Sequence, residues 1–150
     1  MSKYCPRTDS NVTYLACDEC RKDGDCICES FFLLVAGSRN FKDYDKLKST
    51  LDRLLVNKDK VVIVSGGARG ADSLARKYSI EKGFFYKEFP AQWKKYGKAA
   101  GFIRNRQMHE YIARQADRGV VLFWDGQSHG TKDNIGLAEE FCNPIRIIYF

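Results

Sequence analysis

The chain has 150 residues, of which 44% are hydrophobic and 13% aromatic, and its formal net charge is +6. This length suits one folded domain with a proper core, and the hydrophobic share argues against an intrinsically disordered protein. There is no run of about 18 apolar residues, and the N-terminus lacks the apolar segment of a secretory signal. The sequence therefore predicts a cytoplasmic protein with no membrane span.

The charge is unevenly distributed along the chain. The first 30 residues hold four Lys/Arg and six Asp/Glu, which leaves 21 and 13 for the rest and a formal charge of +8 there. A basic domain favours an anionic partner, either a phosphorylated small molecule or a nucleic acid. A generally solvated, lysine-rich surface is the plain alternative.

Five of the six cysteines lie in the first 30 residues, in a segment poor in aliphatic side chains. In a reducing compartment clustered cysteines favour a metal over disulfides, and four thiolates suit tetrahedral zinc. We expect residues 1–30 to form a Cys-rich segment with a structural zinc ion. The predicted ligands are Cys17, Cys20, Cys26 and Cys28, with Cys5 a substitute for one of them. Disulfides or free thiols, and an iron–sulfur cluster, are the alternatives.

From residue 31 onward, apolar runs alternate with amphipathic stretches. The pattern predicts strand 31–36, helix 43–55, strand 60–65, helix 71–82, strand 84–89, helix 97–116, strand 119–124, helix 131–141 and strand 145–149. The strands are too uniformly apolar to face water on one side, which is typical of a parallel sheet covered by helices on both faces. Residues 31–150 are thus predicted to be one Rossmann-like α/β domain.

Small residues follow three of these strands, at 37–40, 65–72 and 125–131. In the strand order 3-2-1-4-5 the second, first and fourth strands are neighbours, whereas in the order 2-1-3-4-5 the third would separate them. We therefore expect the order 3-2-1-4-5, with the three segments meeting in one crevice at the carboxyl edge. Glycine allows close backbone approach to a ligand, and a helix N-terminus favours an anion. Neither the P-loop pattern nor the dinucleotide-binding glycine pattern is present.

Five ordered blocks carry a family resemblance: residues 36–39, 65–72 (SGGARGAD), 90–93 (PAQW), 97–108 (GKAAGFIRNRQM) and 124–131 (WDGQSHGT). They resemble the YspA/YpsA-related branch of the SLOG superfamily, whose relatives include the Smf/DprA DNA-processing proteins and the Lonely Guy phosphoribohydrolases. The resemblance implies a Rossmann-like domain that binds nucleotides or nucleotide-derived molecules, such as NAD or ADP-ribose derivatives.

The resemblance says less about turnover. In the Lonely Guy branch a glutamate follows the last glycine-threonine pair and takes part in glycosidic cleavage, but its position here is Asn134. An amide cannot act as a carboxylate base. We therefore expect a protein that recognises or sequesters its ligand. The alternatives are a hydrolase of a glycosidic or phosphate bond and a DprA-like nucleic-acid binder, and a homo-oligomer is compatible with the sequence. Carboxylates that could substitute are Asp72, Glu88, Asp125 and Asp133.

The residues expected to bind phosphate lie in the segments after the second and fourth strands. We expect these two segments to face each other, with Ser38 and Arg39 between them. Arg39 can bind a phosphate in a two-pronged fork. Asp72 either complements the helix dipole or accepts a hydrogen bond from a ribose hydroxyl. The predicted ligand-binding residues are Gly37, Ser38, Arg39, Ser65, Gly66, Gly67, Arg69, Gly70, Asp72, Lys98, Arg104, Asn105, Asp125, Ser128, Gly130 and Thr131.

The two tryptophans and the two histidines are not assigned to the ligand-binding site. Trp93 and Trp124 either stack on a base or pack in the core. His109 and His129 are interpreted as ordinary surface or loop histidines, and we assign neither a catalytic role.

Overall fold

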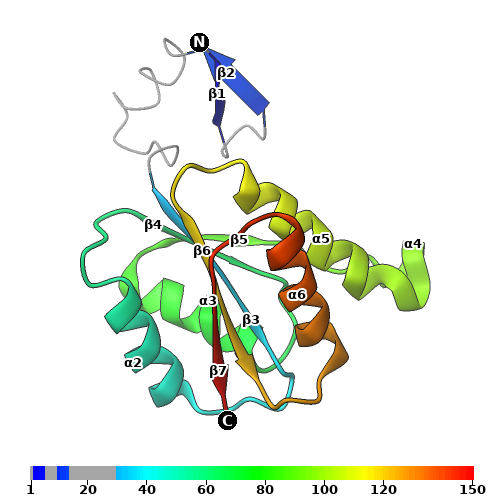
Figure 1. The fold of residues 1–150 in the computed structure, drawn as a ribbon. Helices are drawn as coiled ribbons and strands as arrows, with labels where there is room; N and C mark the ends of the chain where they lie inside the picture. The colour runs from blue at the N-terminus through cyan, green and yellow to red at the C-terminus, as the bar shows by residue number, and fades with distance from the viewer. Residues whose placement is uncertain (1, 6–9, 14–29) are drawn as a thin grey trace.

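The computed structural model describes residues 2–5, 10–13 and 30–150 (Figure 1). Near the N-terminus, β1 (Ser2–Cys5) pairs antiparallel with β2 (Ser10–Thr13). The four main cysteines of the predicted zinc site, at positions 17, 20, 26 and 28, lie outside the described residues. Within the described ranges, no group of three or more His, Cys, Asp or Glu is placed to hold a metal ion. The zinc site and the domain boundary at residue 30 therefore stay predictions.

The five predicted strands form one parallel sheet. They are β3 (Phe31–Gly37), β4 (Val61–Ser65), β5 (Phe85–Glu88), β6 (Arg118–Trp124) and β7 (Ile145–Tyr149). Their spatial order is β5-β4-β3-β6-β7, with every neighbouring pair parallel. This confirms the predicted order 3-2-1-4-5, so the carboxyl ends of β4, β3 and β6 lie side by side.

Helices cover both faces of the sheet (Figure 1). They are α2 (Tyr44–Leu54), α3 (Ala71–Lys82), α4 (Trp93–Tyr96), α5 (Ala100–Ala113) and α6 (His129–Glu140), with a 3₁₀ turn η1 (Gly97–Ala99). None of the helices between residues 30 and 150 is long and apolar enough to cross a membrane.

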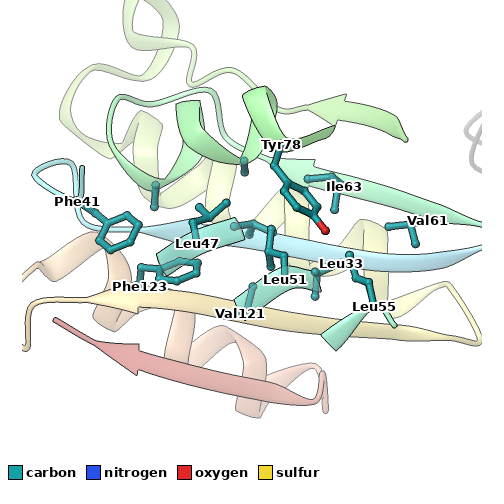
Figure 2. Close-up of a cluster of buried hydrophobic side chains, with 13 residues drawn as sticks. Leu33, Phe41, Leu47, Leu51, Leu55, Val61, Ile63, Tyr78, Val121 and Phe123 are labelled. Carbon is teal, nitrogen blue, oxygen red and sulfur yellow. The ribbon is translucent and has the colours of Figure 1, made fainter. Parts of the chain in front are cut away.

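Alternate residues of the central strands supply two hydrophobic clusters. On one face, Leu33 and Phe123 pack with residues of α2 and α3, such as Leu51 and Tyr78 (Figure 2). On the other face, the intervening strand residues pack against α5. This is the arrangement expected when successive side chains of a fully covered strand point to opposite faces.

The long helix predicted over 97–116 is shorter at both ends in the structure, where α5 ends at Ala113. Gly97 adopts a φ of 57°, which ends α4 and prevents one continuous helix. α5 therefore begins only at Ala100, after the 3₁₀ turn. The last helix, by contrast, starts two residues earlier than predicted, because Ser128 is its N-cap.

Candidate functional site

A cavity of about 720 Å³ opens at the carboxyl ends of β3, β4 and β6. Twelve of the predicted ligand-binding residues line it: Gly37, Ser38, Arg39, Arg69, Asp72, Lys98, Arg104, Asn105, Asp125, Ser128, Gly130 and Thr131. The three strand ends and the start of α5 thus meet at one cavity. The strand order predicts this, because it makes the three strands neighbours in the sheet.

A second cavity of about 410 Å³ adjoins the first across a shared wall that includes Arg39, Arg69 and Trp93. Gly66 and Gly67 line this second cavity, together with Glu88. The remaining two predicted residues, Ser65 and Gly70, line neither cavity.

Ser65 and Gly70 instead shape the loop after β4. The fully buried Ser65 hydroxyl donates to the Asp72 carbonyl over 3.3 Å. Gly70 has a φ of 80°, and a Cβ there would collide with the Ser38 carbonyl oxygen. Only glycine fits this close approach between the loops after β3 and β4.

An internal carboxylate occupies the turn of that loop. Asp72, in the first turn of α3, is only 4% exposed, and its Oδ2 accepts a hydrogen bond from the Ala68 N–H at 3.2 Å. Burial raises the pKa of Asp72 to about 6, although the nearby Arg104 guanidinium and the backbone hydrogen bonds oppose the shift. A backbone donor that a phosphate would need is therefore already paired with a residue of the chain.

Arg104 and Asn105 on α5 tie the two sides of the cavity together. The Arg104 guanidinium is 8% exposed and donates to the Gly66 carbonyl and to Asn105 Oδ1, the latter at 3.0 Å. The Asn105 amide donates to the Gly130 carbonyl at 3.3 Å and to Asp133 at 3.1 Å. Both side chains line the cavity, as predicted, and the hydrogen bonds given above join them to protein groups.

The opposite wall is the N-terminus of α6. Asp125 Oδ1 accepts the N–H groups of Gln127 and Ser128 at 2.9 and 2.8 Å, and these contacts hold its pKa below the usual range. The Asp125 N–H donates to the buried Ser38 hydroxyl at 3.3 Å, which joins this loop to the end of β3. The first N–H groups of a helix have no acceptor within the helix, so this end of the cavity favours an anion.

Charge on the cavity wall is predominantly positive. Its cationic side chains are Arg39, Lys42, Arg69, Lys98 and Arg104, against two carboxylates, Asp72 and Asp125. Such a wall attracts anionic groups of a ligand.

The predicted ligand-binding residues do not include several cavity residues, among them Asn40, Lys42, Phe102 and Asn134, and the sequence leaves Trp93 open between stacking on a base and packing in the core. Asn40 is the last residue of the predicted segment 37–40, Lys42 lies two residues beyond it, and Asn134 stands one helical turn after Gly130, so spacing alone could have included them. Trp93 is 50% exposed and lies beside the Arg39 guanidinium, 5.9 Å from its carbon to the ring centre. Trp124 does not line the cavity; its indole donates to the Ser128 carbonyl at 3.1 Å.

The interpretation of His109 as a surface or loop histidine is wrong. It lies on α5, its side chain is fully buried, and its Nε2 is 3.1 Å from Asn134 Oδ1. Its position one turn after the cavity residue Asn105 was the signal in the sequence that could have placed it inside.

Comparison with known proteins assigns the chain to a family. Residues 32–96 match the family model described as "YspA, cpYpsA-related SLOG family". The Gene 61 protein of Mycobacterium phage D29 is 32% identical over 119 residues, which is 75% of this chain and 92% of the phage protein. The family match includes the ends of β3 and β4, where the cavity lies. The chain belongs to the YspA, cpYpsA-related SLOG family, as its motifs predicted.

Proposed function

We propose that the protein binds a nucleotide derivative of the ADP-ribose or NAD type and holds it without cleaving it. The observation that carries the proposal is the cationic cavity wall opposite the N-terminus of α6. Family membership supports a nucleotide-related ligand. Arg39 and Arg69 provide planar forks for phosphate oxygens, and Ser128 and Thr131 provide hydroxyls at the helix end.

The internal Asp72 carboxylate bears on how such a ligand is oriented. A phosphate in the loop after β4 would have to compete with Asp72 for the Ala68 N–H and would bring a second anion against a buried carboxyl. The phosphates are therefore assigned to α6 and the arginines, and Asp72 to a hydroxyl of the sugar. Of the two sequence interpretations of Asp72, this favours the hydrogen bond to a ribose hydroxyl.

The two adjoining cavities support a ligand with two halves. A mononucleotide needs one cavity, whereas a molecule such as ADP-ribose has a second sugar beyond its diphosphate. The shared wall of Arg39 and Arg69 suits the diphosphate, and the Glu88 carboxylate in the second cavity suits the hydroxyls of a second sugar.

A hydrolase is the second candidate, and one observation favours it. Asp72 is a buried carboxyl on the cavity wall with a pKa raised to about 6, which is the property of a carboxylic acid that can deliver a proton near neutral pH. Against it, the position of the Lonely Guy glutamate is held by Asn134, an amide that cannot take up or release a proton.

Calorimetric titration with ADP-ribose, NAD and AMP, followed by chromatography of the recovered ligand, tests the proposal. We expect ADP-ribose to bind more tightly than AMP and to be recovered intact; released base or phosphoribose would establish the hydrolase instead. Arg69→Ala is expected to weaken ADP-ribose binding about tenfold or more, because a charge-assisted contact is lost. The control Arg53→Ala removes an exposed arginine in the last turn of α2 and should leave affinity unchanged.

The same preparation tests the nucleic-acid alternative. Binding of single-stranded DNA that falls steeply with salt, in the absence of ADP-ribose binding, would replace the small-molecule proposal with a DprA-like function.

A further inference from the structure

A chain of polar side chains runs between α5, α6 and the start of β6, from the cavity wall to the opposite edge of the sheet. Asn134 on α6 lines the cavity and is 4% exposed. His109 on α5 is fully buried behind it, Asn143 follows at 4% exposure, and Arg118 at the start of β6 ends the chain. We call these four side chains the amide relay.

The contacts of the amide relay have only one consistent direction. Arg118 Nε, which can only donate, is 2.6 Å from Asn143 Oδ1, so the Asn143 nitrogen must face His109. That nitrogen is 3.1 Å from His109 Nδ1, and because an NH₂ group donates, Nδ1 must be the unprotonated acceptor. The imidazole proton then lies on Nε2, which donates to Asn134 Oδ1 at 3.1 Å.

The orientation of the Asn134 amide follows from this. Its oxygen is committed to His109, so its NH₂ group is the polar end left for the cavity side, where it donates to the Gly130 carbonyl at 3.2 Å. An NH₂ group has two hydrogens, so one remains for a further acceptor. Burial lowers the pKa of His109 to about 4, which keeps the ring neutral at physiological pH and the direction of the relay fixed.

We propose that Asn134 is a specificity-determining residue that offers a hydrogen-bond donor to an anionic oxygen of the ligand, and that His109 and Asn143 are positioning residues that hold it in this orientation. The proposal rests on the proposed function, because it concerns the phosphate-bearing ligand of the same cavity. The site then selects an acceptor group at the start of α6. A carboxylate at position 134 would present an anionic oxygen there and repel the ligand.

The test of Asn134 compares two substitutions that add the same charge to the same cavity. Asn134→Asp replaces the donor by an acceptor, whereas Asn40→Asp adds a carboxylate at an exposed cavity residue that is not part of the amide relay. At pH 7.5 we expect Asn134→Asp to weaken ADP-ribose binding about tenfold to a hundredfold, the range for losing a hydrogen bond to a charged group. Asn40→Asp should cost several times less. Equal losses for the two variants would overturn the assignment of Asn134.

The positioning role of His109 is tested by a second matched pair. A glutamine amide reaches the position of imidazole Nε2, whereas an asparagine amide reaches only the position of Nδ1. His109→Gln can still donate to Asn134 and should keep ADP-ribose affinity within about twofold, while His109→Asn should lose severalfold. If both variants lose affinity equally, or neither does, His109 merely fills space and the relay has no role in binding.

The proton position in the wild-type protein is a readout that does not depend on the ligand. The ¹⁵N chemical shifts of His109 should show a proton on Nε2 and none on Nδ1, and the opposite tautomer would overturn the relay. Failure of the proposed function looks different: wild-type protein would then bind neither ADP-ribose nor inorganic pyrophosphate, while the ¹⁵N spectrum would still report the tautomer.

Discussion

Asp72→Asn removes a buried carboxyl whose ionisation the fold opposes, and its effect on stability should depend on pH. Burial raises the pKa of Asp72 from 3.8 to about 6. Between these two values the folded protein holds a proton that the unfolded chain has released, so the wild-type free energy of unfolding falls as pH rises. A shift of this size corresponds to about 3 kcal/mol, at 1.36 kcal/mol for each pKa unit.

The stability of the asparagine variant should lack this contribution, because its amide does not titrate while its oxygen can still accept the Ala68 N–H. Urea denaturation, followed by tryptophan fluorescence at several pH values from 4 to 8, gives the difference in unfolding free energy between the two proteins. We expect wild type to lose up to about 3 kcal/mol relative to Asp72→Asn between pH 4 and pH 7.

The control Asp59→Asn removes an exposed carboxylate from the loop before β4 and should leave the pH profile of wild type unchanged. If the difference between wild type and Asp72→Asn is constant from pH 4 to pH 7, Asp72 is not held in a desolvated environment. The assignment of Asp72 as a buried carboxyl with a raised pKa would then be refuted.

Two further predictions concern the loops and the N-terminal segment. Gly70→Ala should destabilise the protein by about 1–3 kcal/mol in urea denaturation, because the φ of Gly70 is positive and an added Cβ would meet backbone atoms. The control Gly136→Ala adds a Cβ in open space on α6 and should be neutral or stabilising by about 0.5–1 kcal/mol. Elemental analysis should find about one zinc ion per chain, lost in a Cys17→Ser/Cys20→Ser variant and retained in Cys142→Ser; metal-free wild type would contradict the zinc proposal.

The architecture could be predicted from the sequence because it depends on the pattern of apolar residues within each segment and on where the glycines lie along the chain. Uniformly apolar runs such as 61–64 identify covered parallel strands, and the positions of the glycines decide between two strand orders. The short helix α4 and the later start of α5 were missed because a glycine is tolerated in a helical pattern, and only the observed φ of 57° at Gly97 shows that this residue separates the two helices.

The hydrogen-bond partners of the site residues could not be predicted from the sequence in the same way. That Asp72 would bond to Ala68 depends on how tightly the loop after β4 curls, and that His109 would meet Asn134 depends on the approach of α5 to α6. Both are contacts between elements, which residue spacing along one helix cannot specify. The residues of the cavity wall could thus be predicted from the sequence, but not which of their polar atoms are left to bind a ligand.

Those internal pairings give the cavity a polarity before any ligand arrives. On the β4 side, Asp72 supplies a buried acceptor, and a backbone donor of the loop is already paired with it. On the α6 side, the first turn of the helix and the Asn134 amide supply donors, while the Asp125 carboxylate is already paired with the N–H groups of Gln127 and Ser128. A ribose phosphate unit of the ligand, with sugar hydroxyls at one end and anionic oxygens at the other, matches this pattern in only one orientation. In the reverse orientation, its phosphates would face Asp72 and its hydroxyls would leave the donors of α6 without an anion, so the same groups that hold the loops in place also determine how the ligand binds.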